Sequence, residues 1–316
     1  MRILVFAALL SSTAALRAPN LRRATPIQAT PSGYPTSVEA AALRGCSAGW
    51  AGLAVACYSG PSARQIVQDC FGLATVTFED NIREPAAGLL ELVSPIFLLE
   101  SILLVGLASG SLLSASDRTR AGGALALTSV GVLSSLAIAV SAGMPIANAA
   151  AVSSVSALVA LTGVLGARAL TADKPTVDEP LDLFLEDARD LLDIQSPLAL
   201  FNANDPSTFY RSSTIVGILV GAAFAFSPVS PIAVFDEELP VTHMLRQNVG
   251  FFIAFSLCPI QAALFRAARD GTLGESVTRA LNTATGIAYA CKAEPSRPAC
   301  LAPCPSHVNP LADHAV

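Results

Sequence analysis

Two long apolar runs separated by a short acidic segment constrain this chain more than any other feature. Residues 212–235 are nearly uncharged, an Asp-Glu-Glu triplet follows at 236–238, and residues 249–268 form a second apolar run. Each run has about twenty residues, the length with which an α-helix crosses roughly 30 Å of hydrocarbon. The segment 211–269 is therefore predicted to be a hairpin of two membrane-crossing helices.

The composition agrees with a membrane protein. The chain is 53% hydrophobic and only 14% charged, whereas about 25% of the residues in an ordinary soluble domain are charged. Its net charge of -5 leaves no basic stripe to neutralise phosphates, which excludes nucleic acid as a partner. Three more apolar runs lead to an all-α, polytopic membrane helix bundle of about five transmembrane helices. They span residues 92–114, 121–142 and 146–169.

Residues 45–85 are predicted to form a short segment on the lumen side of the membrane. Their apolar part, 45–60, falls short of a full span and is interpreted as a short half-buried helix. The alternative is a transfer signal for an inner compartment. Cys46, Cys57 and Cys70 are able to pair if this part faces an oxidising compartment.

Arginine positions predict an orientation. In a five-helix serpentine, six arginines fall on one side, and the acidic triplet falls on the other with Arg83 and Arg246 as exceptions. The positive-inside rule makes the arginine-rich side the cytoplasm-like one. The mature N-terminus is then expected on the opposite side and the C-terminus on the arginine-rich side. The six residues are Arg118, Arg120, Arg168, Arg211, Arg266 and Arg269.

The first 44 residues have the composition of a targeting sequence. Residues 1–15 have a basic start, an apolar core and small residues at their end, as in a secretory signal. Residues 16–44 are rich in Arg, Ser, Thr and Pro and contain one acid, as in a transit peptide. At the junction stands Ala15-Leu16-Arg17-Ala18-Pro19.

This order of two signals resembles the bipartite presequence of algae whose plastids came from a eukaryotic endosymbiont. The junction keeps the Ala and Pro of that family's cleavage pattern, with Leu16 where Phe is usual. The resemblance implies a plastid membrane, thylakoid or envelope, and makes the arginine-rich side the stroma. The alternative is an endomembrane protein with a basic N-terminal tail.

Small residues predict how the helices pack. Gly106 and Gly110 form one GxxxG motif, and Gly217 and Gly221 form another. In lipid such residues let two helix backbones approach closely. Packing within the bundle is the interpretation, and dimerisation is the alternative.

An acidic amphipathic helix is predicted within residues 171–210, on the arginine-rich side. Its strong negative charge disfavours anionic lipid, so Asp182, Glu186 and Asp190 are candidates for docking a protein partner. The alternative is that the helix covers the end of the bundle. The tail, 270–316, is expected to contain one short helix and then Pro-rich coil. The complete division is 1–44, 45–85, 86–170, 171–210, 211–269 and 270–316.

Glu100 stands out because it falls well inside a predicted span. Ionisable residues at that depth are costly, face the protein interior and mark functional sites. Counting from the helix ends places Glu100 level with Ser227 and Ser230 in a Pro-broken turn, which resembles the ion or proton sites of secondary transporters. The alternative is a protonated carboxyl that fixes helix registry through hydrogen bonds to these serines.

These observations favour a non-catalytic plastid membrane protein, an accessory or assembly subunit of a membrane complex. The alternative is a small ion- or proton-coupled transporter or channel that uses Glu100. Catalytic motifs, namely a Walker loop, a Rossmann glycine pattern and HExxH, do not occur in the sequence. Membrane lipid and either a membrane-protein partner or a second copy are the expected partners. No catalytic residue, metal ligand or cofactor is assigned.

Overall fold

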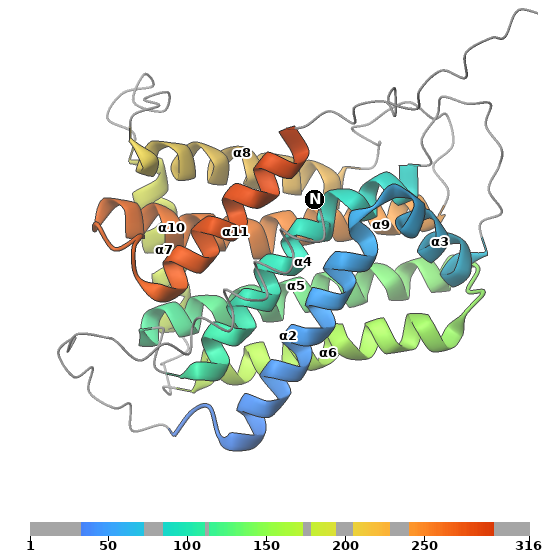
Figure 1. Cartoon of the computed structure of the whole chain (residues 1–316), viewed down its shortest axis with the longest axis horizontal. Coiled ribbons are helices and arrows are strands. Elements are labelled where there is room, and N and C mark those ends of the chain that lie inside the picture. Colours follow the sequence, from blue (N-terminus) through green and yellow to red (C-terminus); the bar gives the residue numbers. More distant parts are fainter. Residues whose placement is uncertain are drawn as a thin grey trace, which may run out of the picture.

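The computed structural model describes residues 33–72, 85–110, 114–172, 178–193, 205–227 and 240–293. Within these ranges the chain forms helices and no strand (Figure 1), which confirms the predicted all-α bundle. In order, the elements are α2 (Ser37–Tyr58), α3 (Gly60–Phe71), α4 (Pro85–Ser109), α5 (Ala115–Ser141), α6 (Ala149–Thr171), α7 (Asp178–Leu192), α8 (Pro206–Phe226), α9 (Pro240–Phe252), the π-helical turn η2 (Ile253–Leu257), α10 (Cys258–Arg269) and α11 (Ser276–Ala293).

Six helices in the described ranges are long and apolar enough to cross a membrane, so the chain is a multi-pass membrane protein. Five correspond to the predicted spans, and α9, η2 and α10 together form the last of them, Pro240–Arg269. The sixth is α2, where the sequence indicated only a short half-buried helix. A capping box explains the difference: the Thr36 hydroxyl accepts from the Glu39 N–H, and the Glu39 carboxylate accepts from the Thr36 N–H. The helix therefore begins at Ser37 and reaches 22 residues.

This extra helix changes the topology. Glu39, near the start of α2, forms an ion pair with Arg168 at the end of α6, with 3.1 Å between Oε1 and Nε. The Arg118 guanidinium lies over the Tyr34 ring, 5.9 Å from its centroid. The start of α2 thus lies at the arginine-rich end of the bundle. The prediction that the N-terminal side of the bundle lies opposite the arginines is wrong, because α2 crosses the bundle and brings α3 to the other end.

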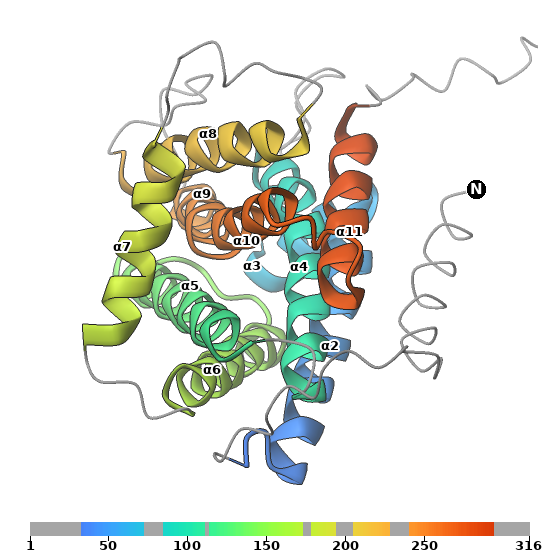
Figure 2. The ribbon, with the colours of Figure 1, turned by 90° about the vertical axis from the view of Figure 1, so that its left-hand side faces the viewer.

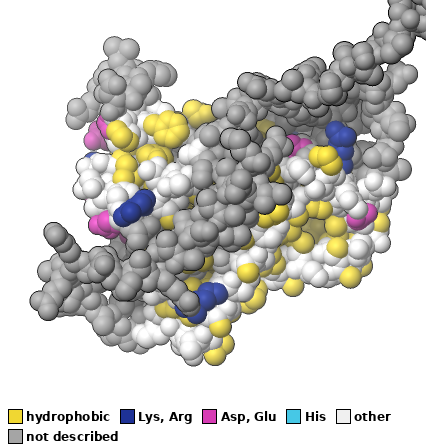
Figure 3. Space-filling view, viewed as in Figure 1, with side chains coloured by type: hydrophobic (Ala, Val, Ile, Leu, Met, Phe, Trp, Pro, Cys, Tyr) yellow, Lys and Arg dark blue, Asp and Glu magenta, His cyan; other side chains and the backbone are white. Residues whose placement is uncertain are grey.

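The opposite end is closed by α3. The Cys70 carbonyl accepts hydrogen bonds from the N–H groups of Ala147 and Asn148, at 2.9 and 3.2 Å, in the connection between α5 and α6. Cys46, Cys57, Cys70 and Cys258 are free thiols in the structure. On the face shown in Figure 3, hydrophobic side chains are scattered over the described surface and Lys, Arg, Asp and Glu side chains are few.

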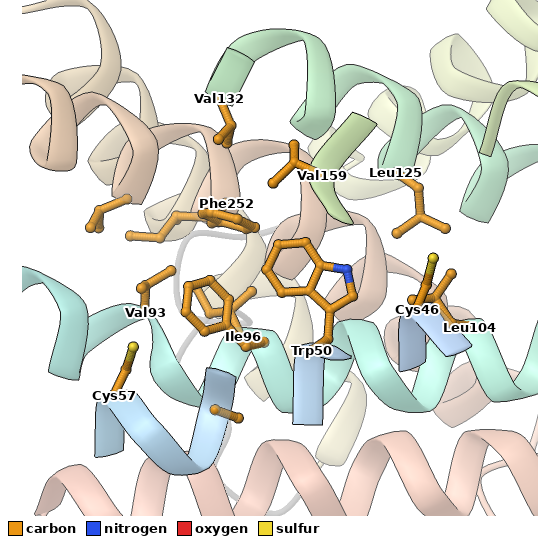
Figure 4. Close-up of a cluster of buried hydrophobic side chains, with 14 of the residues drawn as sticks. Cys46, Trp50, Cys57, Val93, Ile96, Leu104, Leu125, Val132, Val159 and Phe252 are labelled. Carbon is orange, nitrogen blue, oxygen red and sulfur yellow. The ribbon is translucent and has the colours of Figure 1, made fainter. Parts of the chain in front are cut away.

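The core is organised around an aromatic layer, Trp50, Phe97 and Phe252; Figure 4 labels Trp50 and Phe252, which lie side by side. The ring centroids lie 5.1 Å apart for Trp50 and Phe97, 5.6 Å for Trp50 and Phe252, and 5.0 Å for Phe97 and Phe252. The Trp50 Nε1–H donates to the Thr162 hydroxyl at 2.9 Å, which fixes the orientation of the indole. The aromatic layer therefore joins α2, α4, α6 and α9.

The two glycine motifs have different roles. A Cβ on Gly217 would lie 2.7 Å from the Cys258 Sγ, and one on Gly221 would lie 2.9 Å from the Ala254 nitrogen. This second motif therefore packs α8 against the last span. Gly110 instead follows the end of α4 with a φ of +64°, which L-residues rarely adopt. Gly106 is buried within α4, but Gly110 terminates the helix, so the predicted span to residue 114 is too long.

Candidate functional site

Glu100 lies at the centre of the bundle and is 1% exposed. Its position in α4 is about 14 Å from the C-terminal end of that helix, at a rise of 1.5 Å per residue. No basic side chain forms an ion pair with it within the described residues. The carboxyl is thus buried within the bundle, as the sequence predicted, and its role as an ion or proton site stays a prediction.

The Ser256 hydroxyl contacts this carboxyl and the Thr128 hydroxyl contacts Ser256, and we call Glu100, Ser256 and Thr128 the carboxyl cluster. The Ser256 Oγ lies 2.5 Å from Glu100 Oε1, and the donor of the hydrogen bond between them depends on whether the carboxyl carries a proton. The Ser256 and Thr128 hydroxyls lie 2.8 Å apart, and Thr128 donates to the Ala124 carbonyl at 2.9 Å. The other carboxylate oxygen, Oε2, is buried and has no hydrogen-bond partner among the described residues. The cluster joins α4, α5 and η2 through uncharged groups.

The widened turn η2 places Ser256 in this cluster. Pro259 has no N–H with which to bond the carbonyl of Phe255 one turn earlier, so the regular α-helical pattern cannot continue there. The chain widens instead, and the Cys258 N–H donates to the Ile253 carbonyl. Turns of this kind are rare and occur frequently at functional sites. Pro259 is therefore preceded by a π-helical turn in the last span.

Ser227, the one of the two predicted serines that the structure describes, does not lie beside Glu100. Ser227 follows the end of α8, where its carbonyl accepts from the Arg246 guanidinium at 3.1 Å. Arg246 lies about 15 Å along the last span from Ser256, so Ser227 belongs to another part of the bundle. Ser230 and the acidic triplet lie outside the described residues. Counting from helix ends failed because α8 begins and ends earlier than its apolar run suggested.

Arg246 has a role that the sequence did not reveal. Its side chain is buried, and it donates to the carbonyls of Phe224 and Ser227 at 2.7 and 3.1 Å. These carbonyls belong to the last turn of α8, whose final carbonyl groups have no partner within the helix. The Arg246 guanidinium also contacts His243 Nδ1 at 3.0 Å. Arg246 thus caps α8, and the signal for a special role was its position as an exception to the arginine pattern.

The acidic helix α7 crosses the arginine-rich end of the bundle (Figure 2). Asp187 binds two arginines, with 2.8 Å from Oδ2 to Arg120 Nε and 2.5 Å from Oδ1 to Arg266 Nη1. Asp190 binds Arg269 at 2.7 Å. The helix therefore covers the end of the bundle, which was the alternative to partner docking.

Of the three acidic residues of α7 predicted to dock a partner, one forms an ion pair within the bundle and two are exposed. Asp190 is engaged by Arg269, whereas Asp182 and Glu186 are exposed. Glu186 has only a 3.9 Å contact with Arg120 and is 67% exposed. Asp182 and Glu186 remain candidates for docking a partner, and that role stays a prediction.

No protein-family model, curated protein or solved structure matches this chain. Within the ranges that the structure describes, no three His, Cys, Asp or Glu side chains are grouped as metal ligands. The chemistry of the carboxyl cluster therefore has to be derived from its own geometry. It offers one titratable group, two hydroxyls and an unoccupied hydrogen-bonding position at Oε2.

Proposed function

We propose that this multi-pass membrane protein moves protons across a plastid membrane, with Glu100 as the group that takes up and releases the proton. The observation that carries the proposal is the buried Oε2 of Glu100, which has no hydrogen-bond partner among the described residues. A charged carboxylate at this depth is costly. A carboxyl enclosed in this way is therefore neutral at rest and becomes charged only when the proton leaves.

The hydrogen bonds of the carboxyl cluster fit this exchange, because each hydroxyl has one proton to donate. With a proton on Oε1, Glu100 donates to Ser256, Ser256 donates to Thr128, and Thr128 donates to the Ala124 carbonyl. When the proton leaves, Ser256 turns to donate to Oε1. Thr128 is then the donor to either Ser256 or Ala124, so the ionised cluster has one proton fewer for the same three contacts.

A second polar pair lies on the same helix interface, toward the end closed by α3. The Ser135 hydroxyl donates to the Asn248 Oδ1. Ser135 is about 11 Å along α5 from Thr128, so a proton passing between the two pairs needs bridging water. Transfer therefore requires the bundle to admit water at this interface, as polar groups with unmet hydrogen bonds favour.

The experiment is a proton-flux measurement in liposomes that contain the purified protein and a pH-sensitive dye. An imposed pH gradient is expected to decay faster with the wild type than in protein-free liposomes. Glu100→Gln is expected to return the rate to that of protein-free liposomes. The matched control is Glu91→Gln, on the same helix but near its start, which should leave the rate unchanged. Equal flux with wild type and Glu100→Gln, or none with the wild type, would overturn the proposal.

The plastid location has separate support, the resemblance of the N-terminal region to a bipartite presequence. The predicted boundary at residue 44 is too late, because α2 begins at Ser37 and Glu39 pairs with Arg168, so the proposed presequence ends before α2. A fusion of the full chain to a fluorescent protein, expressed in an alga with such plastids, tests it. Fluorescence that coincides with chlorophyll is the expected result. Fluorescence confined to the endomembrane system would contradict it.

A second candidate function is an accessory or assembly subunit, and the outer face of α6 favours it. Ser153, Ser154, Ala157 and Ala160 are exposed there, and small residues permit a membrane helix to approach closely. The exposed face of α8 instead carries bulky side chains such as Leu219 and Phe226, at 67% and 68% exposure. A wild type without proton flux that co-purifies with a larger membrane complex, and loses it on Ala157→Leu, would support this candidate.

A further inference from the structure

A cavity of about 140 Å³ lies between α2, α3, α4, α5, α6 and α9, beside the aromatic layer. Its walls are almost entirely apolar. Figure 4 shows Trp50, Val93, Val132, Val159 and Phe252, which line it, gathered around the indole ring. Among the described residues, the amide and hydroxyl side chains that line it are those of Asn248 and Ser156.

These two polar side chains already have partners. The Ser156 hydroxyl donates to the Val152 carbonyl at 2.7 Å, and the Asn248 Oδ1 accepts from Ser135. A polar ligand would therefore find few unoccupied groups, and a cavity with such walls stays dry. An unfilled void forfeits dispersion contacts along its lining. The cavity is therefore suited to bind a hydrocarbon group.

The cavity reaches the side of the bundle at α6. Val155 lines it, yet it is 40% exposed. Val155 lies about 9 Å inside the first end of α6, a depth at which the surroundings are lipid chains. Val159, one turn deeper on the same helix, also lines the cavity and is 3% exposed.

We propose that the terminal segment of one acyl chain of a membrane lipid enters this cavity past Val155 and ends against Trp50. The volume agrees with part of a chain, because an apolar cavity of roughly 150 Å³ holds a molecule the size of benzene. The source is the bilayer itself, whose chains contact α6. This binding site is separate from the proton-moving role proposed for Glu100.

Trp50 makes the proposal measurable, because it is the only tryptophan in the 316-residue chain. The protein is reconstituted into vesicles of phosphatidylcholine with bromine near the ends of its acyl chains, and into matched vesicles without bromine. Bromine quenches indole fluorescence only at short range. Strong quenching of wild-type Trp50 in the brominated vesicles is expected, since the chain end lies against the ring.

Three substitutions on α6 separate the cavity from the general lipid contact. Val155→Phe narrows the mouth and Val159→Phe fills the interior, and each is expected to abolish most of the quenching. Val164→Phe is the matched control, because Val164 is 60% exposed and does not line the cavity. In this variant the fluorescence of Trp50 should be quenched as strongly as in the wild type. Val155 is already partly exposed, so its substitution keeps the test valid if Val159→Phe does not fold. No quenching in the wild type, or equal quenching in Val155→Phe, would overturn the proposal.

Discussion

Asp187 and Glu100 are both carboxylates enclosed by this bundle, and their surroundings differ in kind. Asp187, whose side chain is 13% exposed, lies at the arginine-rich end between Arg120 and Arg266. Glu100, 1% exposed, lies at the centre, and its hydrogen-bond partner among the described residues is the Ser256 hydroxyl, which in turn contacts Thr128. Two guanidinium groups hold a carboxylate in place through charge-assisted hydrogen bonds, whereas a hydroxyl can form a hydrogen bond with either a neutral or a charged carboxyl. The first arrangement holds α7 on the bundle, and the second permits protonation to change.

The largest effect on stability is expected from Asp187→Asn. The substitution removes the charge that pairs with both Arg120 and Arg266, and it leaves two largely buried guanidinium groups without their counter-ion. A loss of about 2 kcal/mol is expected, less than for a fully buried pair because water reaches this end of the bundle. Detergent-induced unfolding, followed by Trp50 fluorescence, measures it.

The control for this prediction is Asp182→Asn, at an exposed position of the same helix. Exposed surface changes of this kind alter stability by less than about 0.5 kcal/mol. Equal effects of the two substitutions would show that the ion pairs of Asp187 do not hold α7 in place.

A smaller effect is expected from Ser256→Ala. Glu100 Oε1 then loses its hydrogen bond and Thr128 loses a neighbour, while no net charge is removed. The expected loss is about 1 kcal/mol, the usual net value of one buried hydrogen bond. The same unfolding measurement applies, with Ser153→Ala on the exposed face of α6 as the control. A loss as large as that of Asp187→Asn would break the contrast between the two sites.

The smallest effect concerns salt. Raising the ionic strength from 0.1 to 1 M shortens the Debye length from about 10 to 3 Å, which weakens ion pairs that water can reach. The wild type is expected to lose about 0.5 kcal/mol, and Asp187→Asn is expected to lose less. Ser256→Ala should show the full salt dependence of the wild type, because the carboxyl cluster has no ion pair. The reverse order of the two variants would contradict the assignment.

The membrane class, five of the six spans and the position of Glu100 were predictable from the sequence. Each depends on a local property, a run of apolar residues or one charge inside it. The helix α2 was partly missed because its polar first turn, built on the capping box of Thr36 and Glu39, lowers its apolar character. Counting apolar residues does not reveal that a capped polar segment extends the helix by two turns at its N-terminal end.

The side chains that contact Glu100 and Asp187 could not be predicted from local sequence patterns. Ser256 is separated from Glu100 by 156 positions, and Arg120 is separated from Asp187 by 67. Which side chains meet across such distances depends on the axial offset of packed helices, and that offset follows from details such as the π-helical turn before Pro259. The sequence did show the arginines on one side and the acids of α7 nearby. It did not show that Asp187 would form ion pairs with two of these arginines.

The most direct test of the central claim is infrared spectroscopy of the reconstituted protein near neutral pH, in the region where the C=O stretch of a protonated carboxyl absorbs. A protonated Glu100 that exchanges its proton predicts one such band, which shifts when the vesicles are transferred to D₂O and disappears in Glu100→Gln. A band that does not shift in D₂O would contradict proton exchange and assign Glu100 to helix registry alone. The absence of any band lost in Glu100→Gln would contradict the neutral carboxyl itself.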